Sequence, residues 1–387
     1  SLAIRAAVAS GINITYRILF NEAVAMTGGQ AIDGSLSLAQ LIAQLRAEGV
    51  VRIALVSEEI SPRDAPLGVD FYRRADYDTL QREIRKAPGT SVIIYQQLCA
   101  SEKRRRIKRG RLPKATERLI IHPEICEACG DCSRQSNCLS ITPVDTPLGR
   151  KRQVDQYSCK ADLTCVNGSC PSFVSVIDNE LASTATPAEE STVLYDPLPE
   201  PPKLELDGPW SGLVAGIGGT GVLTISSLIA MAAHLEGKGF ATMNQTGLAQ
   251  KFGAVVSHIK IAQEQSDIHA VRVSDKKADL LIGCDWLVAS AGDTLVKVNP
   301  DKTRLVLNHA EAPTSDFIHN PDPPFPADSL RGRVAQYSSE SNKITCDATT
   351  IARELLGDTI GANLFLVGVA YQQGLLPVSA NAINKAI

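Results

Sequence analysis

The sequence has no excess of charge of either sign. Its 387 residues contain 39 Lys and Arg against 42 Asp and Glu, which gives a formal net charge of −3 at pH 7. Proteins that bind nucleic acids or anionic membranes without specificity need a basic surplus. The balance therefore argues against both functions. The length predicts two or three domains, and the composition is that of an ordinary globular protein.

No secretory signal peptide is visible in the sequence, although a truncated N-terminus could have lost one. One stretch, 212–235, is uncharged and long enough to suggest a membrane span. It contains Gly216, Gly218, Gly219 and Gly221, which would interrupt a helix. We therefore predict a strand, a glycine turn and a buried helix instead.

Cysteine is present in an unusual arrangement, with seven of the ten cysteines between positions 126 and 170. A C-x2-C-x2-C run presents three thiolates to one iron–sulfur cluster, and a remote Cys-Pro pair usually supplies the fourth. The pair Cys170–Pro171 fits that role. The predicted ligands of a [4Fe–4S] cluster are Cys126, Cys129, Cys132 and Cys170.

Three cysteines of this block remain, namely Cys138, Cys159 and Cys165. In two-cluster ferredoxins the fourth cysteine of the first run binds the other cluster. That arrangement would place these three on a second cluster, one thiolate short. The missing ligand is Cys99, a non-cysteine group or nothing, and the sequence leaves open whether there is one cluster or two.

Zinc and disulfides are the other structures that clustered cysteines form. Zinc sites favour two separated C-x2-C pairs. Disulfide frameworks belong to small secreted domains. We therefore favour iron–sulfur ligation over a zinc-stabilised structural module and over disulfides. Oxygen-sensitive clusters and reduced thiols indicate the cytoplasm.

Hydrophobic strands alternate with helices from residue 1 to residue 112. This order predicts an α/β fold with a parallel sheet and helices on both faces, in which ligands bind beyond the carboxyl ends of strands. Asn21 and the loop 26–30 follow the first strand, although for Asn21 by itself we favour the role of a turn residue. The expected strands are 12–20, 50–56, 69–72 and 91–98, and the expected helices are 2–10, 37–48 and 77–87.

Two connecting regions follow. The basic run 103–118 is either a solvated linker or strap, which we favour, or a docking site for an acidic partner such as ferredoxin. It contains no aromatic residue that would stack on bases. We expect the iron–sulfur module over 113–180, and its small core would depend on the metal to fold. The Ser-, Thr- and Pro-rich segment 181–204 reads as an extended tether.

The last segment, 205–387, predicts a second α/β domain that opens with the glycine turn at a helix N-terminus. Gly216, Gly218, Gly219 and Gly221 match G-x-G-x-x-G, but Asn244 stands where a dinucleotide site needs an acidic residue. The turn either meets a phosphate group or packs a helix closely on the sheet. Further strands are expected at 280–282, 286–290 and 304–308, and helices at 348–356, 363–373 and 380–387.

Three motifs resemble 2-oxoacid:ferredoxin oxidoreductases, and within that family the large fused bacterial indolepyruvate type. They are NITYRILFNEAVAMTGGQ (13–30), CASEKRRRIKRGR (99–111) with the cysteine block and RKRQVDQYSC (150–159), and TGLAQKFGAVVSH (246–258). Residue 1 is Ser, and helical patterns reach both ends of the chain. We therefore expect an internal piece of a longer polypeptide, with residues 1–112 from the thiamine-diphosphate domain and 205–387 from the gamma-type domain.

The resemblance implies roles for particular residues. Asn21 would be a side-chain ligand and Ala23 a carbonyl ligand of the Mg²⁺ that bridges the two phosphates of thiamine diphosphate, and Thr27 and Gly28 would line the diphosphate. No G-D-G motif precedes Asn21, so another Mg²⁺ ligand is missing. We therefore expect this chain by itself to bind the cofactor poorly and to be inactive.

The resemblance also implies an activity for the whole enzyme. It would oxidatively decarboxylate a 2-oxoacid, such as indolepyruvate or another aryl pyruvate, to an acyl-CoA. Electrons would pass through the clusters to ferredoxin, and CoA would lie near the glycine turn. The partners would be ferredoxin and the rest of the polypeptide or further copies of it. No catalytic acid or base is identified. The rival hypothesis is a non-catalytic electron-transfer or assembly subunit with a degenerate thiamine site.

Overall fold

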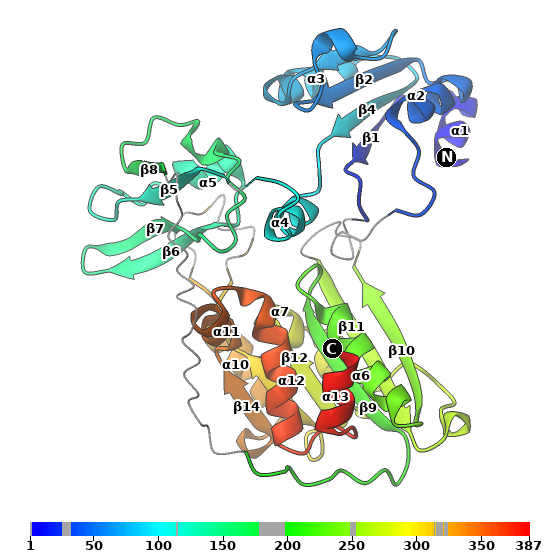
Figure 1. The fold of residues 1–387 in the computed structure, drawn as a ribbon, viewed down its shortest axis with the longest axis vertical. Helices are drawn as coiled ribbons and strands as arrows, with labels where there is room; N and C mark the ends of the chain where they lie inside the picture. The colour runs from blue at the N-terminus through cyan, green and yellow to red at the C-terminus, as the bar shows by residue number, and fades with distance from the viewer. Residues whose placement is uncertain are drawn as a thin grey trace. The chain divides into compact units, whose positions relative to one another are not determined.

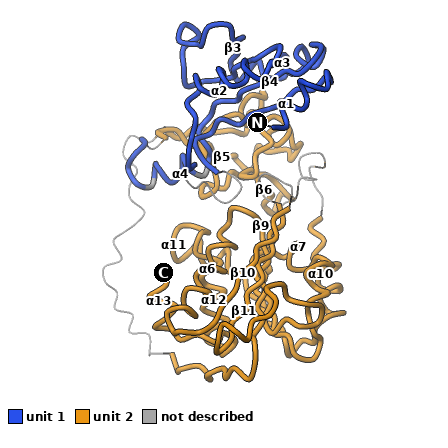
Figure 2. Tube along the Cα trace, turned by 90° about the vertical axis from the view of Figure 1, so that its right-hand side faces the viewer, with its two compact units in different colours: residues 1–113 blue, residues 114–387 orange. Residues whose placement is uncertain are grey.

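The computed structural model describes residues 2–24, 32–113, 115–177, 198–247, 253–312, 314, 320 and 324–387. These residues form two compact units, residues 1–113 and residues 114–387 (Figure 2). Most of the expected tether, residues 181–197, lies outside the described residues.

The first unit is built on a four-stranded parallel sheet in the order β1-β4-β2-β3 (Figure 1). Apolar side chains of α1 and α2 pack on one face of this sheet, and those of α3 pack on the other. The predicted parallel sheet with helices on both faces is therefore confirmed. The elements are α1 (Leu2–Ala9), β1 (Ile14–Phe20), α2 (Leu38–Ala47), β2 (Arg52–Ser57), η2 (Pro62–Asp64), β3 (Asp70–Tyr72), η3 (Arg74–Asp76), α3 (Tyr77–Ile84), β4 (Thr90–Gln96) and α4 (Ala100–Lys108).

The start of α2 shows how the sequence sets an element boundary. The Ser37 hydroxyl accepts a hydrogen bond from the Gln40 amide at 3.3 Å, and the Gln40 side chain accepts one from the Ser37 amide at 2.9 Å. This capping box satisfies two amides that the helix itself leaves without partners.

The basic run begins as a helix rather than as an extended linker. Helix α4 covers its first residues, and Glu102 in this helix pairs with Arg105 at 2.7 Å and Arg106 at 3.0 Å. Arg106 also reaches Glu22 at 3.0 Å. These partners lie within the same unit, which favours the strap interpretation for this part of the run.

The second unit begins with the cysteine-rich module. Strands β5 (Glu117–Ile121) and β8 (Phe173–Ile177) form one antiparallel pair, and β6 (Ile141–Thr146) and β7 (Gly149–Val154) form another (Figure 1). Short helices, α5 (Asp131–Ser136) and η4 (Thr164–Val166), lie in the loops between them. The buried core of the module is four aliphatic residues and three cysteines, namely Leu119, Ile121, Ile141, Val154, Cys126, Cys132 and Cys165.

The rest of the second unit is a six-stranded sheet in the order β10-β11-β9-β12-β13-β14. Its last four strands are parallel, and β11 runs antiparallel to both of its neighbours. Residues of α6, α11, α12 and α13 pack on one face, and residues of α7 and α10 pack on the other. The strands are β9 (Trp210–Ile217), β10 (Gly239–Thr246), β11 (Ala254–Ala262), β12 (Leu280–Gly283), β13 (Arg304–Asn308) and β14 (Lys343–Cys346). The helices are α6 (Val222–Leu235), η5 (Gln265–Asp267), α7 (Trp286–Ala289), α8 (Gly292–Leu295), α10 (Ala327–Ala335), η6 (Glu340–Asn342), α11 (Ala348–Leu356), η7 (Thr359–Gly361), α12 (Ala362–Gln372) and α13 (Ala380–Ala386).

The prediction of a strand at 286–290 was wrong. Residues 286–289 form helix α7, because the Asp285 carboxylate caps it by accepting the Val288 amide at 2.9 Å. Short apolar runs do not distinguish a buried strand from a buried helix. Strand β11, which the sequence analysis missed, lies between β9 and β10, so the two strands that precede and follow α6 in the chain are not adjacent in the sheet.

The uncharged stretch 212–235 has the structure predicted for it. It forms most of β9, then the glycine turn, then α6. Within the described part of the chain, no helix is long and apolar enough to cross a membrane.

Packing and backbone conformation account for the four glycines of the turn. A Cβ on Gly216 would lie 2.7 Å from Val222 Cγ2 and 2.9 Å from Cys284 Cβ, and one on Gly218 would lie 3.3 Å from the Gly253 carbonyl oxygen. Gly219 and Gly221 have φ values of +86° and +101°, which L side chains rarely adopt. The close-packing alternative therefore explains this motif without a ligand.

Replacing Gly216 by Ala should lower the free energy of unfolding of this domain by about 1–3 kcal/mol, because the added methyl group overpacks a filled site. The chain's two tryptophans, Trp210 and Trp286, lie in the two cores of this domain, so their fluorescence in urea titrations measures its unfolding. Gly292→Ala is the control, since a Cβ there meets nothing within 4 Å. Equal stabilities of the two variants would contradict the packing explanation.

His258, the last residue of the motif 246–258, is a buried structural residue. It is 1% exposed in β11. Its Nδ1 accepts the Val273 amide at 3.1 Å, and its Nε2 lies 2.9 Å from Gln245 Oε1. The ring is therefore neutral with its proton on Nε2. Burial, together with the nearby charges of Arg272, Lys297 and Lys260, lowers the pKa of His258 to about 4.

This pKa predicts a loss of stability in acid. Above pH 6.5 the histidine is neutral in both states; below it the unfolded chain binds a proton that the folded chain excludes until about pH 4. The free energy of unfolding should fall by up to about 1.4 kcal/mol per pH unit across that window. Tryptophan-monitored urea titrations between these pH values test it. His258→Gln should flatten the dependence, and His269→Gln, at an exposed position, should not. Equal pH slopes for wild type and His258→Gln would refute the assignment.

Candidate functional site

The cysteine-rich module concentrates the chain's metal-binding chemistry. All ten cysteines have free thiols, and none is joined in a disulfide. Of the seven in the block, Cys126, Cys132 and Cys165 are buried, and Cys129 is exposed.

The thiols fall into two groups, and in each group neighbouring thiols raise the pKa of a buried member. Burial raises the pKa of Cys132, and the charges of Cys126 and Cys170 contribute to that rise. Burial likewise raises the pKa of Cys165 to about 11, with contributions from Cys138 and Cys159. One group therefore comprises Cys126, Cys132 and Cys170, and the other comprises Cys138, Cys159 and Cys165.

Backbone amides point at the sulfurs of both groups. The amides of Ala128, Ser140 and Ala161 each donate to the thiol two residues earlier, and each N···Sγ distance is 3.4 Å; the sulfurs belong to Cys126, Cys138 and Cys159. The Ser172 hydroxyl lies 2.9 Å from Cys170 Sγ. Hydrogen bonds to sulfur stabilise thiolate charge and tune the potential of iron–sulfur clusters. The donor set therefore fits cluster ligation.

A site for a single ion has a different geometry. In the described segments no group of three or more His, Cys, Asp or Glu side chains is arranged to hold one metal ion. Thiolates on different irons of a cluster lie farther apart than four thiolates around one zinc ion.

Asn21 stands immediately after β1 in the first unit. Its Oδ1 accepts the Ala23 amide at 3.2 Å, and its carbonyl accepts the Cys99 amide at 3.2 Å. Glu22 between them has a φ of +56°. The described geometry is thus a turn stabilised by the asparagine side chain. Thr27 and Gly28, the expected diphosphate contacts, lie outside the described residues.

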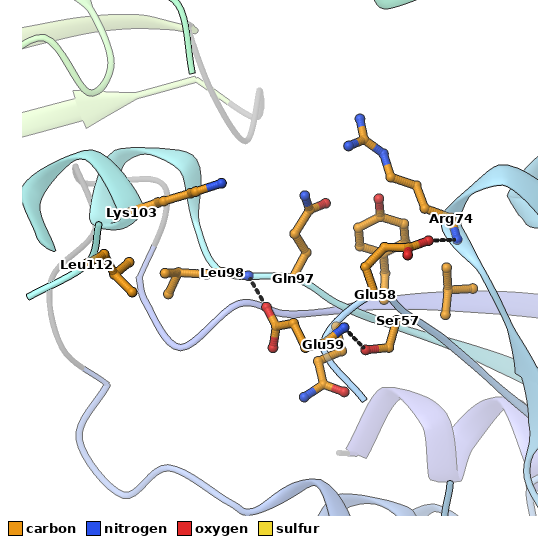
Figure 3. A pocket seen from close by; sticks show the side chains of 11 residues that line it. Ser57, Glu58, Glu59, Arg74, Gln97, Leu98, Lys103 and Leu112 are labelled. Carbon is orange, nitrogen blue, oxygen red and sulfur yellow. Dashed lines mark hydrogen bonds between the residues drawn. The ribbon is translucent and has the colours of Figure 1, made fainter. Parts of the chain in front are cut away.

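A cavity that the sequence analysis missed lies in the same unit, at the carboxyl ends of β2 and β4 (Figure 3). Its volume is about 310 Å³, and its lining includes Glu58, Glu59, Gln97 and Lys103. The Leu98 amide donates to Glu59 at 2.9 Å, which fixes that carboxylate. Polar residues directly after two neighbouring parallel strands were the available signal, since ligand sites of such sheets lie there.

The glycine turn occupies the equivalent place in the second sheet. After β9 the chain crosses to β10 on one side, whereas after β12 it crosses to β13 on the other. Neighbouring parallel strands whose connections diverge mark the usual ligand crevice of open α/β sheets. The Asn363 amide group donates to the Thr220 carbonyl at 2.9 Å and holds the turn. Contact with a phosphate group remains a prediction.

Comparisons with known proteins bear on the second unit. The IorB subunit of indolepyruvate oxidoreductase from Pyrococcus horikoshii is 24% identical over 175 residues, which cover 45% of this chain and 83% of the relative. The IorB subunit of Archaeoglobus fulgidus is 27% identical over 179 residues, covering 45% of this chain and 82% of the relative.

Similar solved structures include a pyruvate oxidoreductase subunit and a 2-oxoglutarate:ferredoxin oxidoreductase. Pyruvate oxidoreductase subunit PORC of Thermotoga maritima has 17% identity and a TM-score of 0.33, covering 46% of this chain and 83% of that one. The 2-oxoglutarate:ferredoxin oxidoreductase of Magnetococcus marinus, solved with 2-oxoglutarate, coenzyme A and succinyl-CoA bound, has 15% identity and a TM-score of 0.35, covering 46% of this chain and 26% of that one.

The family comparison covers the whole second α/β sheet and the motif at 246–258. Residues 211–387 match the family described as pyruvate ferredoxin/flavodoxin oxidoreductase. The resemblance inferred from that motif is thus confirmed for this part of the chain. Residues 211–387, just under half of the chain, are therefore similar to the pyruvate ferredoxin/flavodoxin oxidoreductase family.

Proposed function

We propose that this chain is part of a 2-oxoacid:ferredoxin oxidoreductase that decarboxylates an aryl 2-oxoacid such as indolepyruvate to an acyl-CoA. The observation that carries the proposal is the two groups of cysteines with backbone amides donating to their sulfurs. The family match and the indolepyruvate oxidoreductase relatives support the reaction class and the substrate.

The cysteine module is the electron-transfer part of this proposal, and an iron–sulfur cluster supplies one-electron transfer when it is bound. Cys126, Cys129, Cys132 and Cys170 hold the first cluster, and Cys138, Cys159 and Cys165 hold the second. The chain orients these thiolates through tight loops, and the amides of Ala128, Ser140 and Ala161 offset the negative charge on the sulfurs. The amides thereby lower the cost of gathering thiolates in a small module.

The proposed domains follow the sequence analysis. Residues 1–112 are the carboxyl-terminal part of a thiamine-diphosphate domain, 113–180 are the iron–sulfur module, 181–204 are the tether and 205–387 are the gamma-type domain. In the complete enzyme Asn21, Ala23, Thr27 and Gly28 face Mg²⁺ and diphosphate, and thiamine diphosphate supplies the carbanion chemistry. The glycine turn of the last domain contacts a phosphate of CoA.

The partners are ferredoxin, which accepts the electrons, and the remaining polypeptide or further copies of it. The cytoplasm fits the reduced thiols.

One observation favours a second candidate, a non-catalytic electron-transfer or assembly subunit. Asn21 Oδ1 is engaged with the Ala23 amide in a turn, as a degenerate thiamine site would have it. Thiamine diphosphate binding by the full-length polypeptide distinguishes the two.

Protein purified without oxygen should contain iron and equal acid-labile sulfide, about eight of each per chain for two four-iron clusters. Cys132→Ser should remove roughly half of both, because it deletes a buried ligand of the first group. Cys284→Ser is the matched control, since Cys284 is buried in the core of the gamma-type domain. Visible and EPR spectra measure the loss. Zinc without sulfide would refute the redox function and leave a structural module.

A further inference from the structure

We propose that the carboxylate of Asp162 is the fourth ligand of the second cluster, beside Cys138, Cys159 and Cys165. The inference rests on the iron–sulfur function proposed above and completes a ligand set that is one thiolate short. An oxygen ligand gives one iron of this cluster a chemistry different from that of the other three.

The first argument is spacing. The first ligand run is Cys126-x2-Cys129-x2-Cys132, and the second segment reads Cys159-x2-Asp162-x2-Cys165. Asp162 therefore occupies the middle position of a repeated pattern, where the first run has a cysteine. Carboxylate oxygen is an established type of ligand for iron in proteins.

The second argument is that the backbone repeats as well. Ala128 and Gly130, on either side of Cys129, have φ values of +59° and +77°. Ala161 and Leu163, on either side of Asp162, have φ values of +52° and +58°. Two left-handed residues therefore flank the middle position of each run.

Hydrogen bonds and helix starts follow the same repeat. The first cysteine of each run accepts an amide two residues later at 3.4 Å, from Ala128 in one and Ala161 in the other. A short helix begins one residue before the third ligand of each run, α5 at Asp131 and η4 at Thr164. The loop 159–165 thus has the local geometry of the loop 126–132.

The backbone conformation of Leu163 indicates that the structure requires this loop geometry. A leucine at positive φ is strained, because its Cβ approaches the backbone, whereas the first run has glycine at that place. Strained conformations persist where the surrounding structure requires them, and they gather at functional sites. The strain is explained if the loop must present Asp162 to the same cluster as its neighbours.

The position of the carboxylate agrees with that role. Asp162 lies three residues after Cys159 and three residues before Cys165, in the middle of the loop 159–165. Thr164 donates to Asp162 Oδ1 from its amide at 3.3 Å and from its hydroxyl at 3.0 Å. These bonds fix the Asp162 side chain on the loop that carries Cys159 and Cys165.

The other ligand considered from the sequence does not belong to this group. Cys99 is 4% exposed in the first compact unit, where its amide donates to the Asn21 carbonyl. Asp162 is the non-cysteine group that the loop 159–165 itself offers.

The test oxidises the anaerobically purified full chain with ferricyanide. An iron bound by oxygen leaves more readily than one bound by thiolate. Each [4Fe–4S]²⁺ cluster that converts gives one [3Fe–4S]⁺ cluster and one Fe²⁺, and ferricyanide takes up the electron. We expect wild type to lose about one of its roughly eight irons per chain and to gain the nearly isotropic EPR signal of a three-iron cluster.

Three variants give the proposal its controls. Asp162→Cys should retain all its iron under the same oxidation and show no three-iron signal. Asp162→Asn keeps an acceptor for Thr164 but ligates poorly, so its second cluster should lose one Fe²⁺ and become [3Fe–4S]⁰ before any oxidant is added, which leaves about seven irons per chain. Ferricyanide should then take one electron from this cluster and give the three-iron EPR signal without further loss of iron. Asp145→Ala, at an exposed carboxylate on the β6–β7 hairpin paired with Arg150, should behave as wild type.

The outcomes separate this inference from the proposed function. Identical iron loss and EPR signals in wild type, Asp162→Asn and Asp162→Cys would overturn Asp162 as a ligand. Four irons in wild type, unchanged in Cys138→Ser and Cys165→Ser, would overturn the second cluster but leave the electron-transfer function intact. Zinc without sulfide would overturn both.

Discussion

The crowding of thiols in a small core is the constraint on which the cysteine module depends. Its buried core contains four aliphatic residues beside three cysteines, too few to stabilise a domain of this length by apolar burial. Thiolates that share such a space repel one another and lose hydration. In the proposed function, iron and amide donors would remove both costs, and metal binding in such modules contributes directly to the free energy of folding.

The loops of the module are built to satisfy that constraint. Four of the six non-glycine residues with positive φ in the described chain lie in it, namely Ala128, Asn137, Ala161 and Leu163. Left-handed residues curl the backbone so that amides converge on an anion. The same left-handed residues that strain the backbone therefore also direct amides toward the sulfurs. The proposed ligand Asp162 lies between two of these residues, Ala161 and Leu163.

The two α/β sheets share one feature, which is that polar loops follow the carboxyl ends of their parallel strands. Each is an α/β layer whose parallel strands end in polar loops at one edge: Glu58 and Gln97 in the first unit, the glycine turn and Asp285 in the second. In both, strand carboxyl ends bring together residues that are far apart in the sequence. The proposed enzyme places cofactor and co-substrate chemistry at these edges and keeps electron transfer in the separate thiol-rich module.

The sequence by itself determined the local features. Periodicity and capping located nearly every element of the first unit and the helices at 348–356 and 380–386, because these signals act over a few residues. Cysteine spacing predicted the ligand runs from signals of the same short range. The motif at 246–258 identified the family.

Tertiary structure decided what depends on contacts between distant residues. Helix α7 replaced a predicted strand, because the Asp285 cap and the burial of Trp286 are not visible in a short apolar run. Strand β11 entered the sheet between two strands that precede it in the chain. His258 became a core residue through Gln245 and Val273. The division of the cysteines into two groups required the folded loops, since spacing fixes which residues can share a loop but not which loops meet.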